Sequence, residues 1–144
     1  MDVFGTKSVK LFEYIDRVAE YLGLYDLDVY VEMNIVKECA QGAGGYCHGD
    51  DEDIEIEIAR YDRCGKLSQR EMMINIAHEM VHAQQIASGR LVNDGFIMRD
   101  VGNERELAYA HTWEGERFVN MPYDDQPWEI EAYAREMEVF EACV

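Results

Sequence analysis

Apolar residues recur at every third or fourth position in three segments of the chain, which is the spacing of amphipathic helices. These segments span residues 6–22, 69–88 and 128–142. The first is closed by Gly23, and the last begins just after Pro127, which is favoured at the start of a helix. We therefore expect one helix near the N-terminus, one in the middle of the chain and one at its C-terminal end.

In other segments, apolar and polar residues alternate, as they do in strands with one buried face. Residues 28–35 and 53–58 show the clearest alternation. In the second of these, three isoleucines point to one side and the acids to the other, which fixes the register strongly. A glycine-rich loop at residues 41–45 precedes a short strand expected at residues 46–48.

The segment between the middle and last helices divides into two parts. Residues 107–119 alternate around a turn at Glu114-Gly115, which predicts a hairpin. Residues 90–106 have no clear period, so we expect a loop near the functional cleft. The predicted order is helix, three strands, helix, loop, hairpin, helix, which is an α+β fold with a small mixed sheet.

Composition limits the classes of function. The 144 residues are enough for one domain, 1–144, with a substantial core. With 30 acidic and 13 basic residues, the net charge of −17 makes a nucleic-acid-binding surface improbable, because phosphates would be repelled. We expect a monomer whose acidic surface keeps it in solution.

No secretory signal and no apolar run long enough to span a membrane are visible in the sequence, so we expect a cytoplasmic protein without membrane contact. The four cysteines form no C-x-x-C pair, which favours reduced thiols over a disulfide framework. A second metal site made by Cys47, His48 and Cys64 is a weaker alternative reading of these residues.

Residues 76–82 read Ile-Ala-His-Glu-Met-Val-His, the H-E-x-x-H signature of zinc peptidases inside an apolar helical run. On a helix, His78 and His82 share a face with Cβ atoms about 5–6 Å apart. Both imidazoles can therefore reach one zinc ion at about 2.0–2.1 Å. Glu79 lies beside the ion and can act as the general base toward a zinc-bound water. Ser68 and Glu71 have the spacing of a capping box that begins this helix.

A catalytic zinc usually has three protein ligands, so one more is required for the single ion expected per chain. The extended motif H-E-x-x-H-x-x-G-x-x-H is excluded, because Gln85 and Ser88 stand where its glycine and third histidine would be. The third ligand must come from later in the chain. The candidates are Glu129, Glu131, His111 and an acid of the predicted loop.

Helical geometry favours Glu129 among these candidates. It shares a face with Tyr133, Met137 and Phe140, which we expect to pack inward, and a buried acid among apolar neighbours needs a partner such as a cation. Glu131 instead lines up with Arg135 and Glu138 on the face that we expect to be solvated. The alternative role of Glu129 is that of an acid favoured in the first turn of a helix.

The sequence His78-Glu79-Met80-Val81-His82, followed later by Pro127-Trp128-Glu129-Ile130-Glu131-Ala132-Tyr133, resembles the gluzincin arrangement. In that clan a later helix supplies a glutamate ligand. The order of elements over residues 8–142 is similar to that of compact gluzincin-type zinc metallopeptidases of phages and prokaryotes, including minigluzincins and SprT-like domains.

The resemblance implies a zincin-like fold with zinc on His78, His82 and Glu129 and with Glu79 as the general base. It also implies that the strand from Ile54 to Ile58 is the sheet edge along which an extended peptide binds. The chain departs from the thermolysin-like pattern at Tyr133, where an aspartate commonly supports a histidine ligand. The residue that supports the ligands is therefore left open.

These observations predict a zinc-dependent endopeptidase in which Glu79 activates the attacking water and then protonates the leaving amine. His111 and Tyr123 are the candidates for a further donor to the oxyanion. Two alternatives stay open at this point: a catalytically silent zincin-fold module that binds metal or a partner, and a zinc hydrolase that acts on bonds other than peptides. The presence of Glu79 speaks against a silent scaffold, which has no need of a base.

Overall fold

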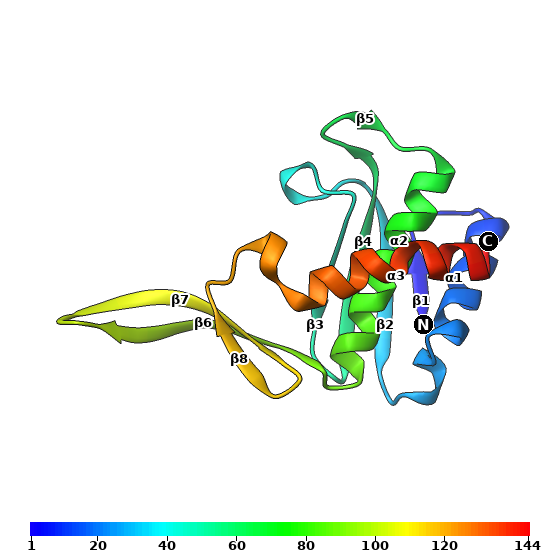
Figure 1. Ribbon diagram of the computed structural model, residues 1–144. Helices are drawn as coiled ribbons and strands as arrows, with labels where there is room; N and C mark the ends of the chain where they lie inside the picture. The colour runs from blue at the N-terminus through cyan, green and yellow to red at the C-terminus, as the bar shows by residue number, and fades with distance from the viewer.

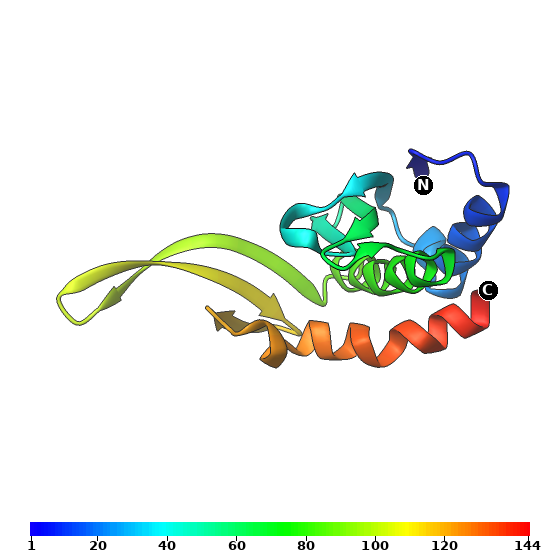
Figure 2. The same cartoon turned by 90° about the horizontal axis from the view of Figure 1, so that it is seen from above.

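A computed structural model describes residues 1–144, and it has an α+β architecture (Figure 1). A mixed sheet forms one layer. Helices α1 (Val9–Tyr21) and α2 (Gln69–Ala87) cover one face of this sheet, and α3 (Pro127–Cys143) packs across α2 and α1 on the side away from the sheet (Figure 2). The α+β prediction is confirmed. No helix in the structure combines the length and apolar character that crossing a membrane requires.

The sheet has the order β1-β2-β4-β3, with the strands β1 (Asp2–Phe4), β2 (Tyr30–Glu38), β4 (Asp53–Asp62) and β3 (Gly45–Gly49). Strands β1, β2 and β4 are parallel, whereas β3 runs antiparallel to β4. The short strand β5 (Gly65–Lys66) pairs with the end of β4. The predicted strands are present, and β1 and β5 are additional.

The prediction that the strand from Ile54 to Ile58 is the sheet edge is wrong. Ile56 pairs with Met33 of β2 on one side and with Cys47 of β3 on the other, so β4 is an interior strand. The alternation of isoleucines and acids reports the two faces of a strand and contains no information about its lateral neighbours. The edge strand on this side of the sheet is β3.

Each helix has a definite start. Ser68 Oγ accepts a hydrogen bond from the Glu71 amide at 3.1 Å, and the Ser68 amide donates to Glu71 Oε2 at 2.7 Å, so the predicted capping box begins α2. Helix α1 begins after Ser8, whose side chain accepts from the Leu11 amide. Pro127 occupies the first turn of α3, where its missing N–H costs nothing.

The inward face of α3 differs from the predicted one. Tyr133 is 54% exposed, and of the predicted apolar stripe only Phe140 is buried. The buried residues of α3 are Trp128, Ala132, Val139, Phe140 and Cys143. The reason is that the first half of α3 lies over His78, His82 and Gln85 of α2, so the face that includes Glu129 meets polar side chains there.

Residues 90–106, predicted as a loop, form the first strand, the turn and the beginning of the second strand of a long hairpin. Strands β6 (Leu91–Val101) and β7 (Glu104–Trp113) pair along their whole length and project away from the body (Figures 1 and 2). A bulge between Asn93 and Gly95 shifts the alternation of β6, which hides the strand period from the sequence. Strand β8 (Glu116–Val119) pairs with the base of β7, which confirms the hairpin predicted at residues 107–119.

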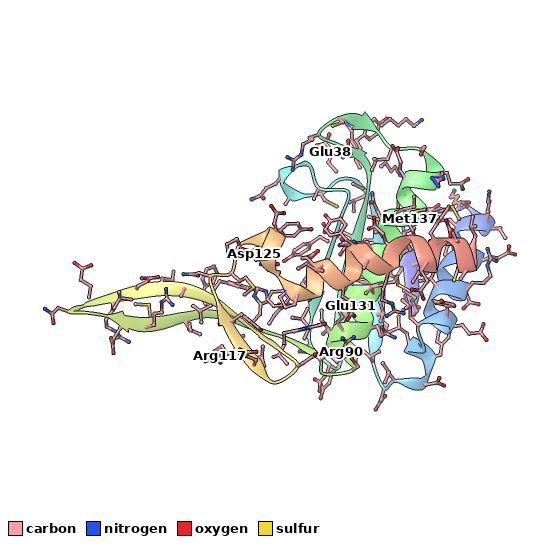
Figure 3. The ribbon with its side chains drawn as sticks, viewed as in Figure 1. Glu38, Arg90, Arg117, Asp125, Glu131 and Met137 are labelled. Atoms are coloured by element: carbon pink, nitrogen blue, oxygen red, sulfur yellow. The ribbon has the colours of Figure 1, made fainter.

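The base of the hairpin is fastened to α3 through Arg90. Its guanidinium lies 2.6 Å from Glu131 Oε2 and 2.8 Å from Glu114 Oε1, and it stacks 4.7 Å from the centre of the Trp113 ring (Figure 3). Glu131 is therefore an anchor for the hairpin, whereas the sequence predicted that it lies on the solvated face.

Candidate metal centre

Three side chains that could bind one metal ion converge between α2 and α3. His78 and His82 lie one turn apart on α2, and Glu129 comes from the first turn of α3. Glu129 Oε1 lies 3.0 Å from Nε2 of each histidine, and Glu129 Oε2 lies 2.9 Å from Nε2 of His82. The ligand atoms of this group all lie within 4.8 Å of one another.

The donor set and its spacing fit a small divalent cation. Three ligand atoms at about 2.0–2.1 Å from a tetrahedral zinc lie about 3.3 Å apart. The separations of 2.9–3.0 Å between the carboxylate and the two imidazoles are close to that value. Two imidazoles and one carboxylate are also a common catalytic zinc set, which leaves further coordination positions open.

Each histidine is oriented by a second contact through its other ring nitrogen. His78 Nδ1 lies 2.8 Å from Glu136 Oε2, and His82 Nδ1 lies 2.8 Å from Gln85 Oε1. Because the Gln85 Nε2 donates to the carbonyl of Trp128 and to Glu131, its oxygen must face His82 and accept the Nδ1 proton. This arrangement leaves Nε2 of His82 directed at Glu129 as the ligand atom.

Glu136 and Gln85 orient the two candidate histidine ligands, and neither contact was predicted from the sequence. Glu136 supports His78, and it takes the place of the aspartate that the resemblance would have put at Tyr133. A signal for it was present, because Glu136 follows Glu129 by seven residues and so lies on the same face of a helix two turns later. Gln85 follows His82 by three residues on α2 and was read only as the residue that excludes the extended motif.

Charges within the cluster determine its titration. Burial lowers the pKa of both His78 and His82, but hydrogen bonds to Glu129 and the nearby Glu79 charge outweigh this effect and raise each pKa above 6.5. Burial raises the pKa of Glu129, yet the two imidazoles bring it down to about 2. In the absence of metal, these three groups therefore stabilise one another as an ion cluster.

Glu79 lies on α2 next to His78 and is 8% exposed. Burial raises its pKa above the ordinary value, against the lowering effect of the two histidines. Its carboxylate has no hydrogen-bonding partner in the protein. Strand β3 passes directly over it: a Cβ added to Gly45 would lie 2.8 Å from Glu79 Cγ, and one added to Gly44 would lie 2.4 Å from Asn75 Nδ2. The two glycines therefore let the sheet edge approach α2 closely.

These residues line a cleft of about 930 Å³ between β3, α2, the start of α3 and the hairpin base. Tyr123, in the turn before α3, donates a hydrogen bond to Glu129 Oε1 at 3.0 Å and contacts the Tyr133 hydroxyl at the same distance. His111 also lines the cleft, but its ring stacks 4.4 Å from that of Trp128. Of the two candidate oxyanion donors, Tyr123 is therefore the one in contact with the ligand cluster.

The alternative metal site at Cys47, His48 and Cys64 is not formed. The structure has one group of potential ligands, His78, His82 and Glu129. His48 lies 3.2 Å from Glu55, Cys64 is exposed in a turn, and Cys47 lines the main cleft. All four cysteines are free thiols, with Cys39 and Cys143 buried.

The comparisons with known proteins give no match, since no protein-family model, curated protein or solved structure is significantly similar to the chain.

The ion cluster predicts how the stability of the metal-free protein depends on pH. The raised histidine pKa values contribute stability that is complete below pH 6.5 and is lost as pH rises through the higher folded values. The lowered Glu129 pKa contributes stability that is present above pH 4.5 and is lost toward pH 2. The urea midpoint of chelator-treated protein should therefore fall above neutral pH, and this fall should be much smaller in Glu129→Gln. Equal pH profiles for the two proteins would contradict the cluster.

The ligand assignment predicts a graded loss of zinc affinity among acids of α3. Glu129→Ala should lower the affinity by more than about 10²-fold, because a ligand is removed, and Glu136→Ala by about 10–100-fold, because a ligand loses its orienting partner. Glu138→Ala is the matched control on the same helix and should bind like the parent. Competition titrations with a chromophoric chelator measure all three. Retained affinity in Glu129→Ala, with loss in Glu131→Ala or His111→Ala, would show that a different residue completes the site.

Proposed function

We propose that this protein is a zinc-dependent endopeptidase with a zincin-like fold of gluzincin type. The observation that supports this proposal best is the convergence of His78, His82 and Glu129 beside the buried, unpartnered Glu79, in a cleft bordered by a free sheet edge. A metal-binding scaffold needs the three ligands but not an acid placed in this way.

Zinc held by His78, His82 and Glu129 would act as a Lewis acid that polarises the scissile carbonyl and makes water more acidic. The rest of the reaction belongs to side chains of the chain itself. Glu79 takes a proton from the attacking water and delivers it to the amine that leaves when the C–N bond breaks. Its burial supports this role, since a carboxylate with a raised pKa is a stronger base.

The substrate is proposed to bind along β3 and not along the strand from Ile54 to Ile58. On its outer side, β3 has no partner strand, and residues 44–47 line the cleft. An extended peptide can pair with this edge through main-chain hydrogen bonds, while its alternate side chains enter the cleft. Because the chain carries a net charge of −17, neutral or basic peptides are favoured over acidic ones.

Tyr123 is proposed as the donor to the developing oxyanion. Its hydroxyl already touches Glu129 Oε1, whereas His111 is held by stacking against Trp128. Burial and the contacts with Tyr133 and Glu129 raise the pKa of Tyr123, so its hydroxyl stays protonated and can donate at neutral pH.

Glu79→Gln tests the proposal directly. The substitution keeps the shape of the side chain and removes the base, so zinc content and fold should be retained while turnover falls by at least about 10²-fold. Turnover is measured on reduced, carbamidomethylated hen lysozyme, an unfolded and basic substrate, with Glu55→Gln as a control for charge removal at an exposed acid.

Two results would decide against this function. The first is full activity in zinc-loaded Glu79→Gln, which would eliminate Glu79 as the base. The second is cleavage by the parent protein that persists after complete removal of metal, since the site would then not be needed.

A further inference from the structure

The hairpin β6–β7 has an exposed apolar face that does not pack against the core. Cross-strand pairing places Phe96 opposite Tyr109 and Met98 opposite Leu107, and alternation puts all four side chains on one face of the ribbon. They are 72%, 37%, 51% and 62% exposed, respectively. We call these four residues the hairpin apolar face.

The opposite face of the same ribbon is of a different character. It carries Ala108, which is 1% exposed, and the ion pair between Arg99 and Glu106 at 2.8 Å. The Asn120 side chain accepts a hydrogen bond from the Tyr109 amide and donates one to the Glu106 carboxylate.

On the opposite face Ile97 is half-buried, and the exposed Val92 and Val101 stand apart at the two ends of the hairpin. The four residues of the hairpin apolar face instead form one contiguous exposed patch, and such patches mark binding surfaces.

The hairpin apolar face is continuous with the candidate metal centre through a row of aromatic rings. Ring centres are 5.1 Å apart for Phe96 and Tyr109, 5.0 Å apart for Tyr109 and His111, and 4.4 Å apart for His111 and Trp128. Tyr109, His111 and Trp128 also line the cleft. A ligand that fills the cleft can therefore continue along the hairpin without crossing a polar gap.

We propose that the hairpin apolar face is an extended docking site for the apolar part of an unfolded, neutral or basic polypeptide whose neighbouring residues occupy the cleft. This inference rests on the proposed function, because it identifies the substrate class of the same site. From Tyr109, which lines the cleft, to Leu107 the strand advances by two residues, or about 7 Å. A substrate therefore needs at least about two extended residues beyond the cleft to cover the face.

Area and charge favour such a polypeptide over a second copy of the chain. Since large apolar side chains have areas of about 150–250 Å², the four partly exposed ones offer on the order of 400 Å². Two copies would bury about 800 Å² together, below the roughly 1,200–2,000 Å² of stable interfaces. Two chains of charge −17 would also repel each other. A strand that is already held in the cleft needs only a small additional surface.

The test measures binding separately from cleavage, in a Glu79→Gln background loaded with zinc. The probe is reduced, carbamidomethylated hen lysozyme, and its affinity is measured by fluorescence anisotropy. Phe96→Ser combined with Leu107→Ser should weaken binding by about tenfold or more, because two of the four apolar contacts are lost. Both positions are exposed, so unchanged circular dichroism and zinc content will show that the fold is intact.

The matched control combines Val92→Ser with Val101→Ser. These residues are 45% and 48% exposed and lie on the opposite face of the same hairpin, so their substitution should leave the affinity within about twofold. Equal affinity for the apolar-face variant and the control would overturn the proposal. So would a dimer, detected by sedimentation, that the apolar-face variant abolishes while lysozyme binding is unaffected.

Failure of the proposed function would look different. Absence of cleavage by the parent protein, together with lysozyme binding that depends on Phe96 and Leu107, would reject the peptidase but support the docking site. Cleavage by the parent protein with no dependence of binding on these residues would support the peptidase and reject the docking site.

Discussion

A buried carboxylate must be paired, and the pairing of Glu129 with two imidazoles is the constraint on which the cleft depends. Only 12% of the Glu129 side chain is exposed, and both of its oxygens face His78 and His82. Removing either helix from this contact would leave charge unpaired in a poorly solvated place, which is costly. The start of α3 is therefore held over the middle of α2, and the remaining elements are arranged around this junction.

The same three side chains would form this junction with and without a bound metal ion, so the junction can be stable in either state. Without metal, Glu129 accepts directly from the imidazoles. With metal, the three groups would bind one cation, while Glu136 and Gln85 keep the rings in place. The second contacts matter in both states, because they determine which ring nitrogen points into the cleft. The site is thus organised by the fold without a bound ion.

The fold could be predicted best where a periodic pattern in the sequence coincided with a signal for the end of an element. For α2, the sequence contains an apolar period, a capping box at Ser68 and Glu71, and a terminating Gly89. The structure has the helix between these two ends. The convergence of His78, His82 and Glu129 could also be anticipated, since each lies on a predicted helix. Glu129 does not lie on an inward apolar face as predicted, because its neighbour Tyr133 is exposed and not packed inward.

The order of the strands in the sheet and the contacts between distant segments could not be predicted from the sequence in this way. The alternation in β4 could not reveal that β3 folds back beside it and becomes the edge, because that depends on pairing between segments. The bulge after Asn93 hid the period of β6, although Gly102-Asn103, a two-residue hairpin turn, was a usable signal. The pairing of Glu131 with Arg90 joins residues 41 positions apart and becomes visible only once α3 is placed.

The central claim is that His78, His82 and Glu129 bind one metal ion together. Diffraction from crystals of the zinc-loaded protein, recorded on both sides of the zinc absorption edge, tests this claim most directly. The account predicts one anomalous peak per chain, at about 2.0–2.2 Å from both histidine Nε2 atoms and a Glu129 oxygen. A peak at any other cluster of side chains, or no peak between α2 and α3 in fully loaded protein, would contradict it.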